Sequence, residues 1–137
     1  PDNVRVSGQL KRGAAASVHV GTVPWGGSGF RMEIYGREGT LVTTGSVSSQ
    51  RGEMLRVHGA QGSNELKDLS IPERFVYVPD DFPRGDPFNV GQLYALFAEA
   101  IRTGQSRLPT FDTAVELHRF IDTIKEASDT GRELPVA

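Results

Sequence analysis

The stretch from Phe30 to Thr40, which reads FRMEIYGREGT, restricts the possible fold more than any other part of the chain. Apolar and polar residues alternate from Phe30 to Tyr35, which is the period of a strand with one buried face. Residues 36–39 then place two glycines around two charged residues, and a β-branched pattern resumes at Thr40. The sequence therefore predicts a β-hairpin with a short glycine-bounded turn.

Further strands are predicted on both sides of this hairpin from the same alternation. Their expected ranges are 3–10, 14–23, 54–59 and 65–71, with a last strand or extended segment at 75–78. A glycine-rich loop that contains Trp25 joins the second strand to the hairpin. Segment 79–88, PDDFPRGDPF, holds three prolines and a glycine, so we expect a long irregular connection there.

Two helices are predicted in the remaining part of the chain. The first begins at Asn89, whose side chain is a suitable cap with Gln92 at the capping-box position, and ends at Gly104. The second opens near Thr110 or Asp112 and stops at Gly131. The apolar stripe of the first helix consists of Val90, Leu93, Tyr94, Phe97 and Ile101. We expect both helices to bury their stripes against the sheet.

Strands followed by helices predict an α+β fold, with a large, mostly antiparallel open sheet and helices packed on one face. The length of 137 residues predicts a single domain over residues 1–137. The other face of the sheet is then either solvated or covered by a partner subunit or another domain. That face carries a mixed set of residues, which fits an interface: Ser17, His19, Arg31, Glu33 and Tyr35.

Composition excludes several classes of function. The net charge of −2 does not favour nucleic acid as a partner, and no apolar run approaches the ~20 residues of a membrane helix. No signal peptide is recognisable. The absence of cysteine excludes disulfides and thiolate metal sites and indicates a cytoplasmic setting. The chain begins at Pro1 without an initiator Met, so we expect it to be a piece of something longer.

No specific catalytic, cofactor-binding or metal-binding motif is present. The GGSG at 26–29 lacks the GxGxxG spacing, and there is no GxSxG sequence. The three histidines, His19, His58 and His118, have no metal-ligand spacing. His19 on the open face either binds a sugar hydroxyl or shuttles a proton, or is an ordinary surface histidine. Trp25 either stacks on a ligand or packs on protein.

The order of four segments resembles a known family. These segments are VSGQLKRGAAASVHV, GFRMEIYGREGTL, NVGQLYALFAEAIRTGQ and PTFDTAVELHRFIDTIKEASDTGRELPV. The most telling pieces are EIYGREGTL at 33–41 and AVELHRFIDTIKEASDTGR at 114–132. Nearly the whole chain is similar to the C-terminal domain of the glucose-fructose oxidoreductase, inositol dehydrogenase and rhizopine-catabolism (Gfo/Idh/MocA) family.

This resemblance implies a function that the chain does not complete by itself. Family members pair an N-terminal Rossmann domain, which holds NAD or NADP, with a C-terminal domain that contributes to the substrate pocket and to dimer or tetramer contacts. Their reaction is hydride transfer to or from a sugar, polyol or related hydroxy compound. The glycine fingerprint, the Glu-Lys-Pro segment and the Asp-x-x-x-His helix of the family are not in these 137 residues. We therefore expect the chain alone to be inactive, with no catalytic residue and no bound cofactor.

By their position in such a domain, five residues are candidates for substrate binding: His19, Trp25, Arg31, Asn89 and Tyr94. Two other interpretations stay open. One is a non-catalytic ligand-sensing or protein-interaction module with the same fold. The other is a free-standing enzyme that uses His19 with a nearby carboxylate.

Overall fold

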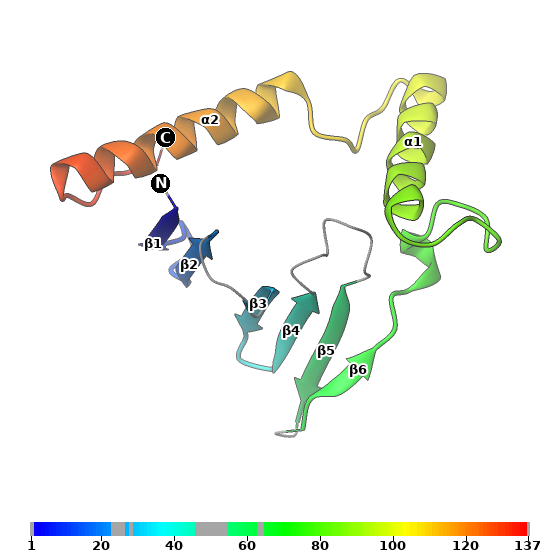
Figure 1. The fold of residues 1–137 in the computed structure, drawn as a ribbon, viewed down its shortest axis with the longest axis horizontal. Helices are drawn as coiled ribbons and strands as arrows, with labels where there is room; N and C mark the ends of the chain where they lie inside the picture. The colour runs from blue at the N-terminus through cyan, green and yellow to red at the C-terminus, as the bar shows by residue number, and fades with distance from the viewer. Residues whose placement is uncertain (1, 23–26, 28, 46–54, 63–64, 137) are drawn as a thin grey trace. The chain divides into compact units, whose positions relative to one another are not determined.

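A computed structural model of the chain describes residues 2–22, 27, 29–45, 55–62 and 65–136. Two antiparallel sheets precede two α-helices (Figure 1). The α+β class is confirmed, and the strands lie in one two-stranded and one four-stranded sheet. The chain divides into two compact units, Pro1–Gly26 with Pro109–Ala137, and Gly27–Leu108. Trp25 and the predicted polar loop at 46–53 lie outside the described residues.

The first unit contains a hairpin and the second helix. Strands β1 (Asn3–Gln9) and β2 (Ala15–Gly21), both predicted from the sequence, pair antiparallel, and in the turn between them Gly13 takes a φ of 89°. In the register Val6 lies opposite Val18 and Arg5 opposite His19, so the hairpin has one apolar and one polar face. The half-buried residues of the hairpin are all on the apolar face: Val4, Val6 and Ala16.

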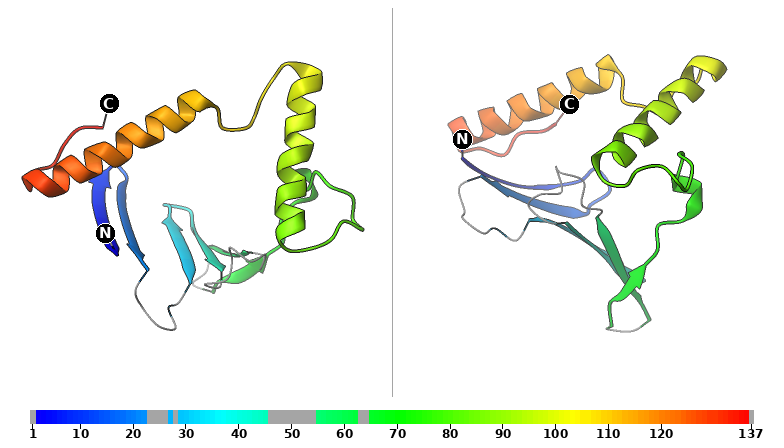
Figure 2. Two further views of the ribbon diagram at one scale, coloured as in Figure 1. Left: turned by 45° about the horizontal axis from the view of Figure 1, so that its top comes forward. Right: turned by 45° about the vertical axis from the view of Figure 1, so that its right-hand side comes forward.

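Helix α2 (Phe111–Thr130) begins and ends where the sequence predicts. The Thr110 hydroxyl accepts from the Thr113 N–H, and the Thr113 hydroxyl accepts from the Thr110 N–H, which completes a capping box. Gly131 ends the helix with a φ of 64°. The half-buried residues Thr123, Ile124 and Ala127 are in the C-terminal half of the helix, which lies over the hairpin (Figure 2).

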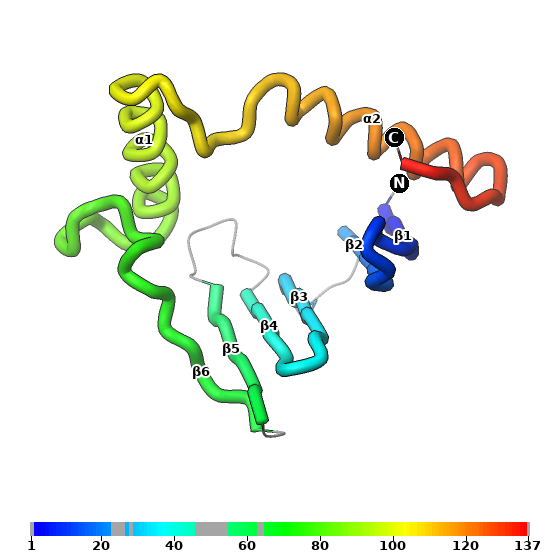
Figure 3. Tube along the Cα trace, turned by 180° about the vertical axis from the view of Figure 1, so that it is seen from behind, coloured from blue at the N-terminus to red at the C-terminus, as the bar shows by residue number. Residues whose placement is uncertain are grey.

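The second unit is built on a four-stranded antiparallel sheet in the order β3-β4-β5-β6, seen from behind in Figure 3. The strands are β3 (Phe30–Tyr35), β4 (Gly39–Gly45), β5 (Arg56–Gln61) and β6 (Lys67–Leu69). The predicted central hairpin is β3-β4, closed by the Gly36 N–H donating to the Gly39 carbonyl at 2.9 Å. Glycine is required at position 39, because a Cβ there would lie 2.6 Å from the Ala60 carbonyl oxygen of β5.

Register divides the side chains of this sheet between two unlike faces. The apolar face carries Phe30, Met32, Ile34, Leu41, Val57 and Leu69. The polar face carries Arg31, Glu33, Tyr35, Thr40, Val42, Thr44, Arg56, His58, Ala60 and Asp68. Val42 is the one residue of this sheet that is fully buried among those described, at 4% exposure, whereas the large side chains of the apolar face are mostly about half exposed.

Helix α1 (Asp86–Thr103) begins three residues earlier than predicted. Its cap residue is Gly85, and Pro87 lies within the first turn. Proline is tolerated there because the first N–H groups of a helix have no partner inside it, and its fixed φ already suits a helix. The expectation that no regular element includes residues 79–88 was therefore wrong for the last three of them. Asn89 is not the cap.

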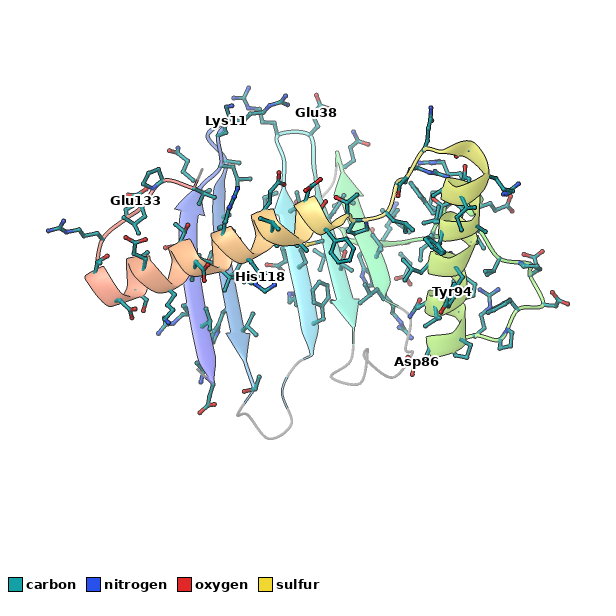
Figure 4. All side chains as sticks on the ribbon, turned by 90° about the horizontal axis from the view of Figure 1, so that it is seen from above. Lys11, Glu38, Asp86, Tyr94, His118 and Glu133 are labelled. Atoms are coloured by element: carbon teal, nitrogen blue, oxygen red, sulfur yellow. The ribbon has the colours of Figure 1, made fainter. Side chains whose placement is uncertain are left out.

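The face by which α1 packs is also not the predicted one. Its half-buried or buried residues follow a helical stripe that includes three small residues: Phe88, Gly91, Gln92, Ala95, Leu96, Glu99 and Ala100. We call this set the inner stripe. The predicted stripe of Val90, Leu93, Tyr94, Phe97 and Ile101 is 51–70% exposed, and we call it the outer stripe. Tyr94 is labelled on it in Figure 4.

The inner stripe packs against the segment that precedes α1 in the chain. A Cβ at Gly91 would lie 2.7 Å from the Phe82 ring and 3.2 Å from Val78 Cγ1, so the helix approaches this segment closely. The Gln92 amide oxygen accepts from the Tyr77 N–H at 2.5 Å, and its amide nitrogen donates to the Phe75 carbonyl at 2.9 Å. The strand or extended segment predicted at 75–78 begins instead with a 3₁₀ turn, η2 (Glu73–Phe75), and is extended at Val76.

Candidate functional site

The polar face of the four-stranded sheet brings together charged and hydroxyl-bearing side chains from all four strands of the sheet. Its residues form rows that cross the strands, because antiparallel partners point to the same side. One row contains Arg31, Thr44 and Arg56, and we call it the cationic row. The next contains Glu33, Val42, His58 and Asp68, and we call it the acidic row. Strand register alone brings these groups together from four segments.

A hydrogen-bonded ladder runs along β3 at one end of both rows. The Arg31 guanidinium donates to Glu33 Oε1 through Nε at 2.8 Å and also through Nη2, while the Tyr35 hydroxyl donates to Glu33 Oε2 at 3.0 Å. The bond from Arg31 and the bond from Tyr35 lower the pKa of Glu33 below its ordinary value. The same carboxylate raises the pKa of Tyr35. Glu33 is therefore held ionised and oriented.

A second pair lies at the other end of the acidic row. His58 Nε2 lies 2.8 Å from Asp68 Oδ1, across the pairing of β5 with β6. The His58 side chain is 28% exposed and that of Asp68 is 83% exposed. Sequence reasoning missed this pair, because nine residues that include a turn separate the two positions. Only the exact strand register would have indicated it, since a shift by one residue would put the two side chains on opposite faces.

The predicted substrate-binding residues are distributed over both units. His19, on the polar face of the β1-β2 hairpin, has its Nε2 3.4 Å from Asn3 Oδ1. Arg31 belongs to the ladder on β3. Asn89 and Tyr94 are both exposed on α1 but point about 140° apart, because they are five residues apart on a helix. Trp25 lies outside the described residues. The structure therefore joins Arg31 to Glu33 and Tyr35, and does not join it to another predicted residue of its own unit.

The described part of the chain contains neither a group of metal ligands nor a membrane-spanning helix. Among residues 2–22, 27, 29–45, 55–62 and 65–136, no three His, Asp or Glu side chains are grouped so as to hold a metal ion. Neither α1 nor α2 combines the length and the hydropathy that crossing a bilayer requires. What the polar face offers chemically is therefore a set of oriented hydrogen-bond donors, acceptors and charges.

Comparison with known proteins gives the class of the chain. Residues 1–137 match the C-terminal alpha/beta domain of an oxidoreductase family. The chain belongs to that family, Gfo/Idh/MocA, and the resemblance found in its sequence is confirmed. No curated protein and no solved structure matches the chain.

Proposed function

We propose that these 137 residues are the substrate-side and oligomerisation domain of an NAD(P)-dependent oxidoreductase that acts on a sugar, a polyol or a related hydroxy compound. The nicotinamide cofactor would be held by a Rossmann domain N-terminal to this one, and the chain itself would bind no cofactor. The cysteine-free composition supports a cytoplasmic setting. Family membership supports the reaction class.

The exposed apolar surface of the second unit is the observation that carries this proposal. On the apolar face of the sheet, Phe30, Met32, Ile34, Leu41 and Leu69 are 44–52% exposed. The side chains of the outer stripe of α1 are 51–70% exposed. Surface of this kind is typical of a part that is completed by other protein.

The chemistry of the polar face fits the proposed substrate class. Hydroxyl groups of a polyol are bound by ionised carboxylates and by guanidinium donors held in fixed directions. The ladder supplies both, since Arg31 and Tyr35 fix the Glu33 carboxylate. Hydride transfer additionally needs a nicotinamide held against the substrate carbon, and the proposed cofactor domain would hold it there.

An activity comparison tests the proposal. The 137-residue chain and the full-length protein encoded by its gene are assayed in parallel with a panel of sugars and polyols, following NAD(P)H absorbance. We expect turnover by the full-length protein and none by the chain alone. Turnover by the chain alone would overturn the proposal that hydride transfer needs a separate cofactor domain. A full-length protein that binds neither NAD nor NADP would instead identify a ligand-sensing or interaction module.

A further inference from the structure

The cationic row holds positive charge that the chain does not neutralise. Arg31 donates to Glu33 through Nε and Nη2, and a guanidinium has five N–H donors, so the Nη1 donors of Arg31 remain available. The Arg56 guanidinium has neither an ion pair nor a side-chain hydrogen bond within the part of the chain that the structure describes. Both side chains are exposed, that of Arg31 by 54%. Two guanidinium groups can therefore donate to an anion from outside the chain.

Strand register places these two guanidinium groups on either side of a hydroxyl. Arg31 lies opposite Thr44 across β3-β4, and Thr44 lies opposite Arg56 across β4-β5. The three side chains share one face of the sheet, and the Cα atoms of the two arginines are two strand spacings apart, which corresponds to about 10 Å. The planar fork of a guanidinium matches a carboxylate or a phosphate in geometry as well as in charge. An anion above Thr44 therefore meets a guanidinium on each side and a hydroxyl donor beneath it.

The ionised Glu33 carboxylate lies beside this row and adds an acceptor for a hydroxyl. Glu33 is two residues from Arg31 along β3, which corresponds to about 7 Å. Three donor atoms already bind the Glu33 carboxylate, namely Nε and Nη2 of Arg31 and the Tyr35 hydroxyl. A carboxylate has about four acceptor positions, so one remains for a ligand. A molecule of monosaccharide size can reach both places, and repulsion from Glu33 keeps an acidic group on the side of the cationic row.

We propose that the substrate is a hydroxy compound that carries an acidic group, either a carboxylate or a phosphate. The cationic row binds the acidic group through Arg31, Thr44 and Arg56, and Glu33 accepts from a hydroxyl of the same molecule. This inference rests on the proposed function and adds the charge of the substrate. Exposed ion pairs are modest and are screened by salt, so Arg56 contributes about fivefold to the affinity, and less at high salt.

Matched ligands test the charge of the substrate. The full-length protein is titrated by calorimetry with glucose, glucuronate and glucose 6-phosphate, and then with the same three forms of galactose and of mannose. In at least one of these sets an acidic form should bind about tenfold more tightly than the neutral sugar, and salt should weaken only the acidic form. The tighter acidic form distinguishes a carboxylate from a phosphate. Acidic forms that bind no more tightly than the neutral sugar in every set would overturn the proposal.

Variants of Arg56 test whether the cationic row is responsible. Arg56→Gln should lower the affinity for the acidic form about fivefold and leave that for the neutral sugar unchanged. Arg56→Lys keeps the charge and should restore part of the affinity. Lys67→Gln removes a charge from the opposite face of the sheet, where Lys67 pairs in register with Gly59, and should change neither affinity. Circular dichroism of each variant establishes that the sheet is retained.

The outcomes of these titrations separate the two proposals. An Arg56→Gln variant that binds the acidic form as tightly as the wild-type protein would overturn the role of the cationic row. Calorimetry detects binding without hydride transfer, so it decides the charge of the ligand whether or not the full-length protein oxidises it. Absence of NAD(P)H turnover would count against the oxidoreductase proposal alone.

Discussion

The two stripes of α1 differ in the side chains that they carry and in how far these are buried. The inner stripe includes the small residues Gly91, Ala95 and Ala100 and is half-buried or buried, because Gly91 lets the helix approach Phe82. The outer stripe consists of large apolar side chains, among them Phe97 and Ile101, and leaves them about half exposed or more. Close approach therefore decided which face of α1 packs within the chain, and the large apolar side chains of the other face stay exposed.

Filling the inner stripe should have the largest effect on stability. Gly91→Val places a branched side chain where a single Cβ already lies 2.7 Å from the Phe82 ring. Overpacking costs about 1–3 kcal/mol, more than the helix propensity gained on replacing glycine, which is below ~1 kcal/mol. Urea unfolding of the 137-residue chain measures the loss. Ala98→Val, on an exposed position of α1, is the matched control and should cost below ~1 kcal/mol.

Removing the side-chain amide of Gln92 from the inner stripe should have the next largest effect on stability. Gln92→Ala leaves the Tyr77 N–H and the Phe75 carbonyl without their partner. We expect a loss of about 1–2 kcal/mol in the free energy of unfolding. Gln92→Glu keeps the acceptor for Tyr77 and loses the donor to Phe75, so its cost should include the repulsion between two oxygens. An unchanged urea midpoint for both variants would show that the helix is held by packing alone.

A change on the outer stripe should scarcely alter the stability of the chain. Phe97→Ser removes a ring that is 53% exposed, and exposed substitutions usually stay within about 0.5 kcal/mol. Binding of a hydrophobic dye should fall, because the apolar area falls. In the full-length protein the same change should cost more if the stripe is covered there. A loss of 2 kcal/mol or more in the isolated chain, by contrast, would mean that the ring is already packed.

The smallest expected effect is on the pH dependence of stability, and it concerns the ladder of Arg31, Glu33 and Tyr35 on β3. The folded-state pKa of Glu33 is lowered, so the ladder contributes fully to stability above the ordinary value of 4.5. That contribution is lost as the pH falls through the lower folded-state pKa. Wild-type stability should thus fall in acid slightly more than that of Glu33→Gln, which cannot titrate there. Thermal unfolding across this pH range measures the difference, and parallel curves would contradict it.

Local features of the fold were predictable because short-range chemistry sets them. The β3-β4 hairpin, the Thr110 cap and the glycine ends of both helices follow from alternation, capping and left-handed conformations. The start of α1 was misplaced because Pro87 and Gly85 are ordinary loop residues by composition, and only their positions relative to the helix make them compatible with it.

Features that depend on long-range geometry were not predictable in the same way. Choosing between the two stripes of α1 requires knowing that Phe82 lies against Gly91. Pairing His58 with Asp68 requires the register of β5 with β6. Among the predicted site residues, the face that carries Arg31 follows from the alternation along its strand. The fixed orientation of the Glu33 carboxylate depends on hydrogen-bond geometry, which the sequence does not provide. Sequence periodicity indicates which residues share a face, and tertiary contacts select the face that is used.

The Gln92 amide satisfies one donor and one acceptor of the backbone at Phe75 and Tyr77, as a neighbouring strand would. A single side chain thereby imitates a short piece of sheet and joins a helix to the crossover that precedes it. A shift of α1 along its axis would therefore have to break both hydrogen bonds or move the backbone between Phe75 and Tyr77 with it.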